Sequence, residues 1–139
     1  MAGRSPIAYQ VFTAQAATGN SNTFFAGDFR NAVVTINTAG SANMTIKFQG
    51  ALAAVGAASG SQAPDFTAAQ SATNRWEYIQ VVDYQSGAQI DGDTGIVLSG
   101  TDDNRIVEFN TNAVDYISVQ VSARSAGSVT STITLTDNE

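Results

Sequence analysis

Two oxygen-rich turns are the clearest candidates for chemistry in this sequence of 139 residues. Asp91 and Asp93 lie in the first turn, Asp-Gly-Asp-Thr-Gly, and Asp102 and Asp103 lie in the second, Gly-Thr-Asp-Asp-Asn. Calcium takes about six to eight oxygen ligands from loops of this composition, so the two turns could share one ion. Neither turn has the spacing of an EF-hand loop, and Asp, Asn and Gly are also the ordinary residues of tight turns. A calcium site and a purely structural role for these turns both stay open.

A second candidate site is aromatic. The residues that could together form a sugar-stacking platform are Trp76, Tyr78, Tyr84, Tyr9 and Tyr116. Trp76 and Tyr78 are two residues apart in a segment rich in aromatic and β-branched residues, so they share one face of a predicted strand. An exposed pair of this kind can stack on sugar rings, whereas a buried pair packs the core. The sequence does not decide which face of this strand is exposed to solvent.

The residues that most enzymes use for acid–base and nucleophilic catalysis are missing. The chain contains neither histidine nor cysteine, which excludes a Ser-His-Asp triad, thiolate chemistry and zinc sites of the Cys/His type. No G-x-S-x-G or phosphate-binding glycine motif is present, and the single lysine, Lys47, alternates outward on a predicted strand. We therefore expect a protein that is not an enzyme and that has no cofactor.

The charge of the chain argues against two classes of partner. The net charge is −6, and only 13% of the residues are charged. An acidic surface repels phosphate backbones and anionic lipid, so we expect no nucleic acid or membrane partner. The sequence has no apolar run of the length of a membrane span, and its N-terminus lacks the apolar region of a secretory signal. These features predict a protein made in a cytoplasm.

The main periodicity of the sequence is two, which is typical of half-buried strands. Residues 114–136 alternate apolar and Ser/Thr/Gln positions on both sides of Ser-Ala-Gly-Ser, which predicts a hairpin of two long strands with its turn at 125–128. Residues 34–37 and 44–49 alternate in the same way, and Thr-Ala-Gly-Ser-Ala at 38–42 predicts a turn between them. The predicted core residues on the apolar faces are Met44, Ile46, Phe48, Ile117, Val119, Val121, Ile133 and Leu135.

These segments together predict one all-β domain that spans residues 1–139. Further strands are expected at residues 7–13, 76–82, 95–98 and 105–109, which gives about eight in all. Their spacing favours an antiparallel β-sandwich or jelly roll. Residues 1–5 are expected to form a flexible N-terminal arm.

A long loop is predicted at residues 51–72, where alanine, serine and glycine dominate and Asp65 is the only charge. Loops of this length in compact domains are usually functional or disordered. Because the segment is small and apolar, we expect it to contact a neighbouring protein. The candidate contact residues are Ala51, Leu52, Val55, Pro64 and Phe66.

Three stretches resemble a group of small structural proteins of tailed bacteriophages. They read "SANMTIKFQGA", "PDFTAAQSATNRWEYIQVVDYQSGAQIDGDTGIVLSG" and "NTNAVDYISVQVSARSAGSVTSTITL". The shared features are a Pro-Asp-Phe turn, an Asn-x-Trp strand, a Gly-x-Thr-Gly turn and a closing Ala-Gly-Ser-Val segment. These are fold signatures, so the resemblance carries over no functional residue.

The resemblance implies a non-enzymatic virion protein that decorates and stabilises a phage capsid by bridging its subunits. The implied partners are the major capsid protein and further copies of this chain, as a homotrimer. The implied location is the capsid surface, after assembly in the host cytoplasm. Two alternatives stay open: a neck, tail or head-fibre component of the same particle, and a carbohydrate-binding β-sandwich used in host attachment.

Overall fold

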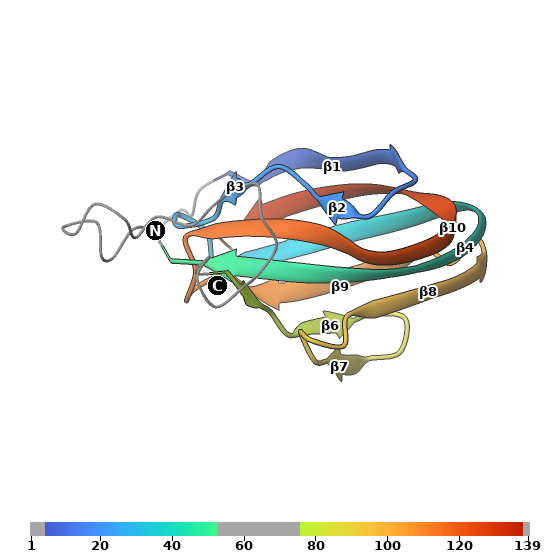
Figure 1. Ribbon diagram of the computed structural model, residues 1–139. Helices are drawn as coiled ribbons and strands as arrows, with labels where there is room; N and C mark the ends of the chain where they lie inside the picture. The colour runs from blue at the N-terminus through green and yellow to red at the C-terminus, as the bar shows by residue number, and fades with distance from the viewer. Residues whose placement is uncertain (1–4, 53–75, 138–139) are drawn as a thin grey trace.

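The computed structural model describes residues 5–52 and 76–137, and all regular structure within them is β (Figure 1). These residues form ten strands hydrogen-bonded into one antiparallel sheet, which confirms the predicted all-β, antiparallel class. No helix in this part of the chain is long and apolar enough to cross a membrane. The strands are β1 (Ile7–Gln15), β2 (Gly19–Asn20), β3 (Phe24–Phe25), β4 (Asn31–Ala51), β5 (Glu77–Tyr78), β6 (Val81–Asp83), β7 (Ala88–Ile90), β8 (Ile96–Thr101), β9 (Arg105–Asn110) and β10 (Tyr116–Thr136).

Two strands of 21 residues, β4 and β10, form the centre of the fold. They pair with each other along their whole length, from Ala51 with Tyr116 at one end to Asn31 with Thr136 at the other. This pairing shows that the two predicted hairpins are wrong. A turn at 38–42 would pair the two halves of β4 with each other, but each half pairs with β10 instead.

At the positions of the predicted turns, β4 and β10 bend together. Gly40 and Gly127 have φ angles of 75° and 80°, in the region that favours glycine. The pairing register also shifts three times between Val121 and Ser128, as expected where extra residues let a strand turn a corner. Short glycine-containing segments are compatible with both a tight turn and a bulged bend, so the local sequence did not separate the two.

The bend folds the sheet into two facing layers (Figure 1). The first layer has the order β1, second half of β10, first half of β4, β9, β6 and β7. In the second layer the other halves of β4 and β10 lie together, flanked by β8 and by the short strands β2, β3 and β5. The chain therefore builds both layers from the same two strands.

The hydrophobic core lies between the layers. All eight predicted core residues are buried, each with 1% or less of its surface exposed. Phe48 of the second layer packs against Phe109 of the first, with their ring centroids 5.6 Å apart. The buried apolar residues of both layers belong to one cluster, so the alternation in the sequence predicted the inward faces correctly.

Other predicted elements differ in detail. The strand expected at 76–82 is divided into β5 and β6, and β2, β3 and β7 were not expected. Strands of two or three residues contain too few positions to show a period of two. Ala51 is the last residue of β4 rather than part of a loop, and residues 53–72 of the predicted loop lie outside the described residues, as do residues 1–4 of the predicted arm.

The bend predicts that Gly127 is sensitive to substitution. A Cβ at this position would lie 2.8 Å from Cα of Ala42, and its φ of 80° is unfavourable for other residues. Gly87→Ala is the matched control, because Gly87 has a φ of 72° but an added Cβ there would meet no heavy atom within 4 Å. We expect Gly87→Ala to cost about 1–2 kcal/mol of unfolding free energy, and Gly127→Ala a further 1–3 kcal/mol, in urea titrations. Equal costs would show that the bend tolerates a side chain.

Candidate functional site

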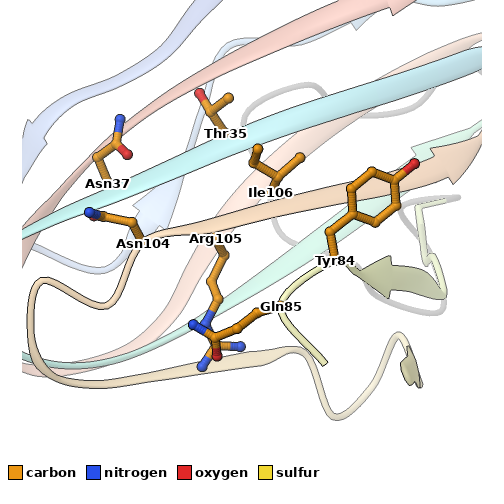
Figure 2. A pocket seen from close by; sticks show the side chains of 7 residues that line it. All are labelled: Thr35, Asn37, Tyr84, Gln85, Asn104, Arg105 and Ile106. Carbon is orange, nitrogen blue, oxygen red and sulfur yellow. The ribbon is translucent and has the colours of Figure 1, made fainter. Parts of the chain in front are cut away.

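A groove lies on the outer side of the first layer, next to the bend (Figure 2). Its volume is about 520 Å³, which is within the range of small-ligand sites. It is formed by side chains of β4 and β9 and by the residues that follow β6. The lining residues are Thr35, Asn37, Tyr84, Gln85, Asn104, Arg105 and Ile106.

The strand register orders these side chains in two rows. Thr35 of β4 is directly opposite Ile106 of β9, and the backbone N–H of Tyr84 donates to the carbonyl of Ile106 at 2.9 Å. Thr35, Ile106 and Tyr84 therefore lie side by side across β4, β9 and the segment that follows β6, as Figure 2 shows. Two positions nearer the bend, Asn37 and Asn104 also line the groove and form a row of amides (Figure 2). Tyr84 and Ile106 are 54% and 46% exposed, so an aromatic ring and an aliphatic wall face solvent here.

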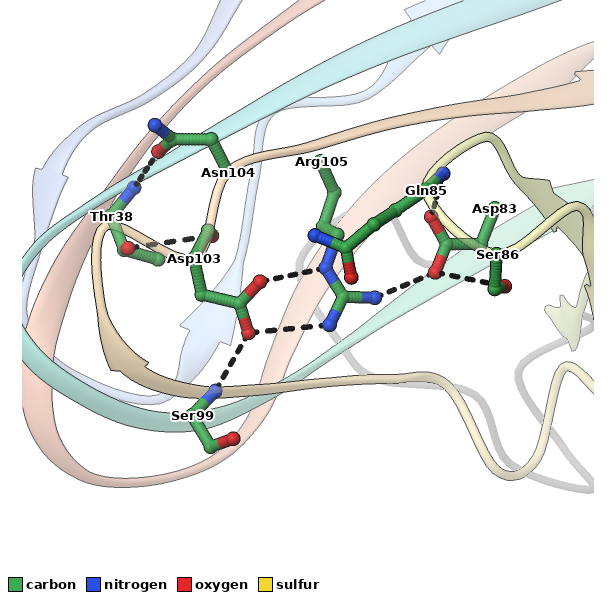
Figure 3. A network of polar contacts seen from close by, with 8 residues as sticks. All are labelled: Thr38, Asp83, Gln85, Ser86, Ser99, Asp103, Asn104 and Arg105. Carbon is green, nitrogen blue, oxygen red and sulfur yellow. Dashed lines mark hydrogen bonds and ion pairs between the residues drawn. The ribbon is translucent and has the colours of Figure 1, made fainter.

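A polar network fixes the start of β9 beside the groove (Figure 3). Arg105 Nε and Nη2 donate to the two carboxylate oxygens of Asp103, at 2.7 and 3.2 Å. Arg105 Nη1 donates to Asp83 Oδ2 at 2.6 Å. Asp83 is 2% exposed and also accepts the backbone N–H of Gln85 at 3.0 Å. One guanidinium thus joins two carboxylates from separate parts of the sheet.

The network also shifts the pKa values of Asp103 and Arg105. Burial disfavours the charged form of Asp103, but hydrogen bonds from Arg105 and from the N–H of Ser99 outweigh it and lower the pKa of the carboxyl group. The hydrogen bond to Asp103 in turn raises the pKa of Arg105, against the opposing effect of burial. Arg105 is therefore permanently charged and already paired, so it is not a vacant cation for an anionic ligand.

Further hydrogen bonds hold the amide row in place. The backbone N–H of Thr38 donates to Asn104 Oδ1 at 3.1 Å, and its hydroxyl donates to the Asp103 carbonyl at 3.4 Å. At the other side of the groove, a hydrogen bond to Glu108 raises the pKa of the Tyr84 phenol. The groove is thus built on strands, and the contacts of Thr38 with Asn104 and Asp103 hold its side near the bend.

The four aspartates of the calcium hypothesis are not brought together. The turn with Asp91 and Asp93 precedes the six-residue strand β8, and the turn with Asp102 and Asp103 follows it. The two turns lie at opposite ends of that strand, about 20 Å apart at 3.3 Å per residue. Asp103 is bound to Arg105, and Asp91 Oδ1 accepts the N–H of Asp93 at 2.8 Å. In the described residues no three Asp or Glu side chains form a group suited to a metal ion.

The aromatic pair is also placed differently from a sugar platform. Trp76 is only 2% exposed and therefore offers no face to solvent. Tyr78 is half-buried, donates its hydroxyl to Gln120 Oε1 at 2.9 Å, and has Nζ of Lys47 4.6 Å from its ring centroid. Burial, and a smaller effect of Asp93, raise the pKa of Tyr78. This pair serves packing and a polar contact on the second layer.

The predicted partner-contact residues are placed only in part. Ala51 is 3% exposed and cannot contact a partner, whereas Leu52 is 55% exposed. Val55, Pro64 and Phe66 lie outside the described residues.

Leu52 belongs to a set of exposed side chains at the end of the molecule opposite the bend. The register shows this directly, because this end holds the first and last residues of β4 and β10. Phe25 packs edge-on against Tyr116 with ring centroids 5.6 Å apart, and Tyr9 stacks on Phe24 at 5.1 Å. We call this set the distal apolar end. Its residues are Ile7, Tyr9, Phe25, Leu52 and Tyr116; the first four are 37%, 37%, 48% and 55% exposed.

Sequence reasoning named Tyr84 among the possible sugar-stacking aromatic residues, but it did not place Tyr84 with the other residues of the groove. Tyr84 follows Val81-Val82-Asp83 in the sequence, and nothing local shows that it ends beside Ile106, 22 positions later. The available signal was the alternation Arg105, Ile106, Val107, in which Ile106 falls on the face opposite the buried Val107. An isoleucine on the outer face is a hint of an apolar surface site.

Comparisons with known proteins support the fold. No protein-family model matches this chain, and no curated protein sequence matches it. Among solved structures, the chain is similar to the crystal structure of the SPBc2 prophage-derived protein YomS. The TM-score is 0.65, the sequence identity is 13%, and the match covers 94% of this chain and 92% of that one. A likeness at this identity shows a shared fold, and the protein that shares it comes from a prophage.

The network predicts that Arg105 is important for stability. In Arg105→Ala, Asp83 stays buried without its counter-ion, so we expect a loss of about 3–5 kcal/mol in urea unfolding. Arg30→Ala is the control, because Arg30 is half-exposed and its ion pair with Asp137 lies at the surface. That change should cost about 1 kcal/mol or less. Similar losses in both variants would contradict a structural role for the network.

The lowered pKa of Asp103 predicts a specific acid dependence. A group whose pKa is depressed on folding stabilises the native state above its ordinary pKa of 3.8, and this contribution disappears as the pH falls through the lower, native value. Unfolding free energy measured between pH 6 and pH 2 should therefore decline less steeply in Asp103→Asn than in the wild type. Parallel curves would show that Asp103 does not titrate differently in the two states.

Proposed function

We propose that this protein is a non-enzymatic structural component of a tailed-phage particle, bound to the outside of the capsid as a decoration protein. The observation that carries the proposal is the fold shared with a prophage-derived protein over 94% of this chain. The resemblance of the sequence to small phage structural proteins points in the same direction. Both concern the architecture, so the attachment itself must be argued from the surface.

The distal apolar end is the surface best suited to attachment. Phe25 and Leu52 expose about half of their side-chain surface there, next to the stacked rings of Tyr9 and Phe24. Their burial against a capsid subunit would contribute roughly 25 cal/mol per Å² of apolar area. No single copy needs a large interface, because many copies on one shell add their weak contacts.

The proposed partners are the major capsid protein and two further copies of this chain, which together form a trimer on the shell. The location is the capsid surface, after assembly in the host cytoplasm. A rigid two-layered body suits this role, since it presents one end to the shell and keeps its own fold. The carbohydrate alternative based on Trp76 and Tyr78 loses its support, because Trp76 is buried.

Co-sedimentation with empty capsids tests the proposal. The wild type should bind and raise the temperature at which the shells break. We expect Leu52→Asp and Phe25→Asp to reduce binding at least tenfold, because each places a carboxylate in an apolar contact. Val97→Asp is the matched control: Val97 is 56% exposed on β8, away from the distal apolar end, and should bind as the wild type does.

Salt gives an independent reading. An apolar contact should lose little affinity between low and physiological ionic strength.

Wild-type protein that does not bind capsids would overturn the proposal. Cryo-electron microscopy that shows a few copies at one vertex would instead assign the protein to the neck or tail. Equal loss in all three Asp variants would exclude the distal apolar end as the contact.

A further inference from the structure

The groove on the first layer has no part in the attachment proposed above. It lies on the outer side of the first layer, where Asn37 and Asn104 line it near the bend, whereas the distal apolar end holds the opposite ends of β4 and β10. Phe25 and Leu52 lie at the end of the second layer, whereas the groove is lined by residues of the first layer, so the two surfaces use different parts of the fold. A copy attached through its distal apolar end would leave the groove open to solvent.

The lining of the groove offers no unpaired charge to a ligand. Arg105 is its only charged residue, and its guanidinium is already bound to Asp103 and Asp83 at 2.6–3.2 Å. A phosphate, sulfate or acidic peptide would have to compete with these two carboxylates. Glu108, which raises the pKa of the Tyr84 phenol, adds a further negative charge nearby. The electrostatics therefore disfavour an anionic ligand.

The amide groups of the lining are suited to hydrogen bonds with hydroxyl groups of a ligand. Asn37 makes no side-chain hydrogen bond within the described residues, so its amide offers both a donor and an acceptor to the groove. Asn104 uses its Oδ1 for the N–H of Thr38 and keeps its NH₂ donors. An amide has its donor and acceptor side by side, which matches two adjacent hydroxyl groups of a sugar.

The apolar groups supply the other half of a sugar site. Tyr84 exposes 54% of its surface, and its backbone is fixed to Ile106 through the hydrogen bond at 2.9 Å. Its ring and the adjacent Ile106 form an apolar wall beside the amide row (Figure 2). An aromatic ring is attractive to the C–H face of a pyranose, and one held on strands costs little entropy to use.

We propose that this groove binds a neutral carbohydrate, with a sugar ring stacked on Tyr84 and its hydroxyl groups hydrogen-bonded to Asn37 and Asn104. The network of Arg105 with Asp103 and Asp83 holds this arrangement ready before the ligand arrives. On a phage particle, such a site would give each bound copy weak affinity for surface glycans, multiplied by the number of copies.

A glycan array that includes neutral and acidic glycans, probed with the purified protein and followed by titration of the best binder, tests this site. We expect binding to neutral glycans, a loss of roughly tenfold or more in Tyr84→Ala, and near wild-type affinity in Tyr84→Phe, which keeps the ring. Asn37→Ala should also weaken binding. Phe25→Ala is the control, because it removes an exposed aromatic ring at the distal apolar end.

The outcomes separate this site from the proposed function. Tyr84→Ala should keep full capsid binding, and Leu52→Asp should keep full glycan binding. The carbohydrate site is overturned if no neutral glycan binds, if only acidic glycans bind, or if Tyr84→Ala binds as the wild type does. It is also overturned if Tyr84→Ala loses capsid binding, since the groove would then be a protein contact.

Discussion

The uninterrupted pairing of β4 with β10 is the interaction on which the rest of this structure depends. Two strands of 21 residues stay hydrogen-bonded to each other through a shared bend, so each supplies one half to each layer. The remaining strands are additions to this folded pair. Because the bend requires close approach of Gly127 to Ala42, a small region determines how the two layers face each other.

The bend also explains the position of the network of Arg105 with Asp103 and Asp83. β8 pairs with the second half of β4, and β9 pairs with the first half. The chain that connects the end of β8 to the start of β9 therefore crosses from one layer to the other. Asp103 and Arg105 stabilise this crossing, and Asp83 brings in the end of β6. The same ion pairs neutralise Arg105, the only charged residue that lines the groove.

The groove and the distal apolar end have different chemistry. The groove on the first layer carries amides, a hydroxyl, Tyr84 and Ile106, whereas the distal apolar end exposes phenylalanine, leucine, isoleucine and Tyr9. A body with one apolar end and one polar groove suits a protein that must be attached at one place and remain accessible at another. This division follows from the two layers, because Phe25 and Leu52 end the second layer and the groove lies on the first.

The sequence by itself determined the all-β class and the inward faces of the long strands. The reason is that alternation is a local property, and the apolar positions of a strand mark the face that is buried. Met44, Ile133 and the other predicted core residues are buried as expected. Strand partners were decided only by the tertiary structure. A glycine segment is compatible with a hairpin or a bend, and the choice depends on whether residues far apart in the chain, such as Ile46 and Val121, pair with each other. The groove needed the same information, since Thr35, Tyr84 and Ile106 meet only through non-local pairing.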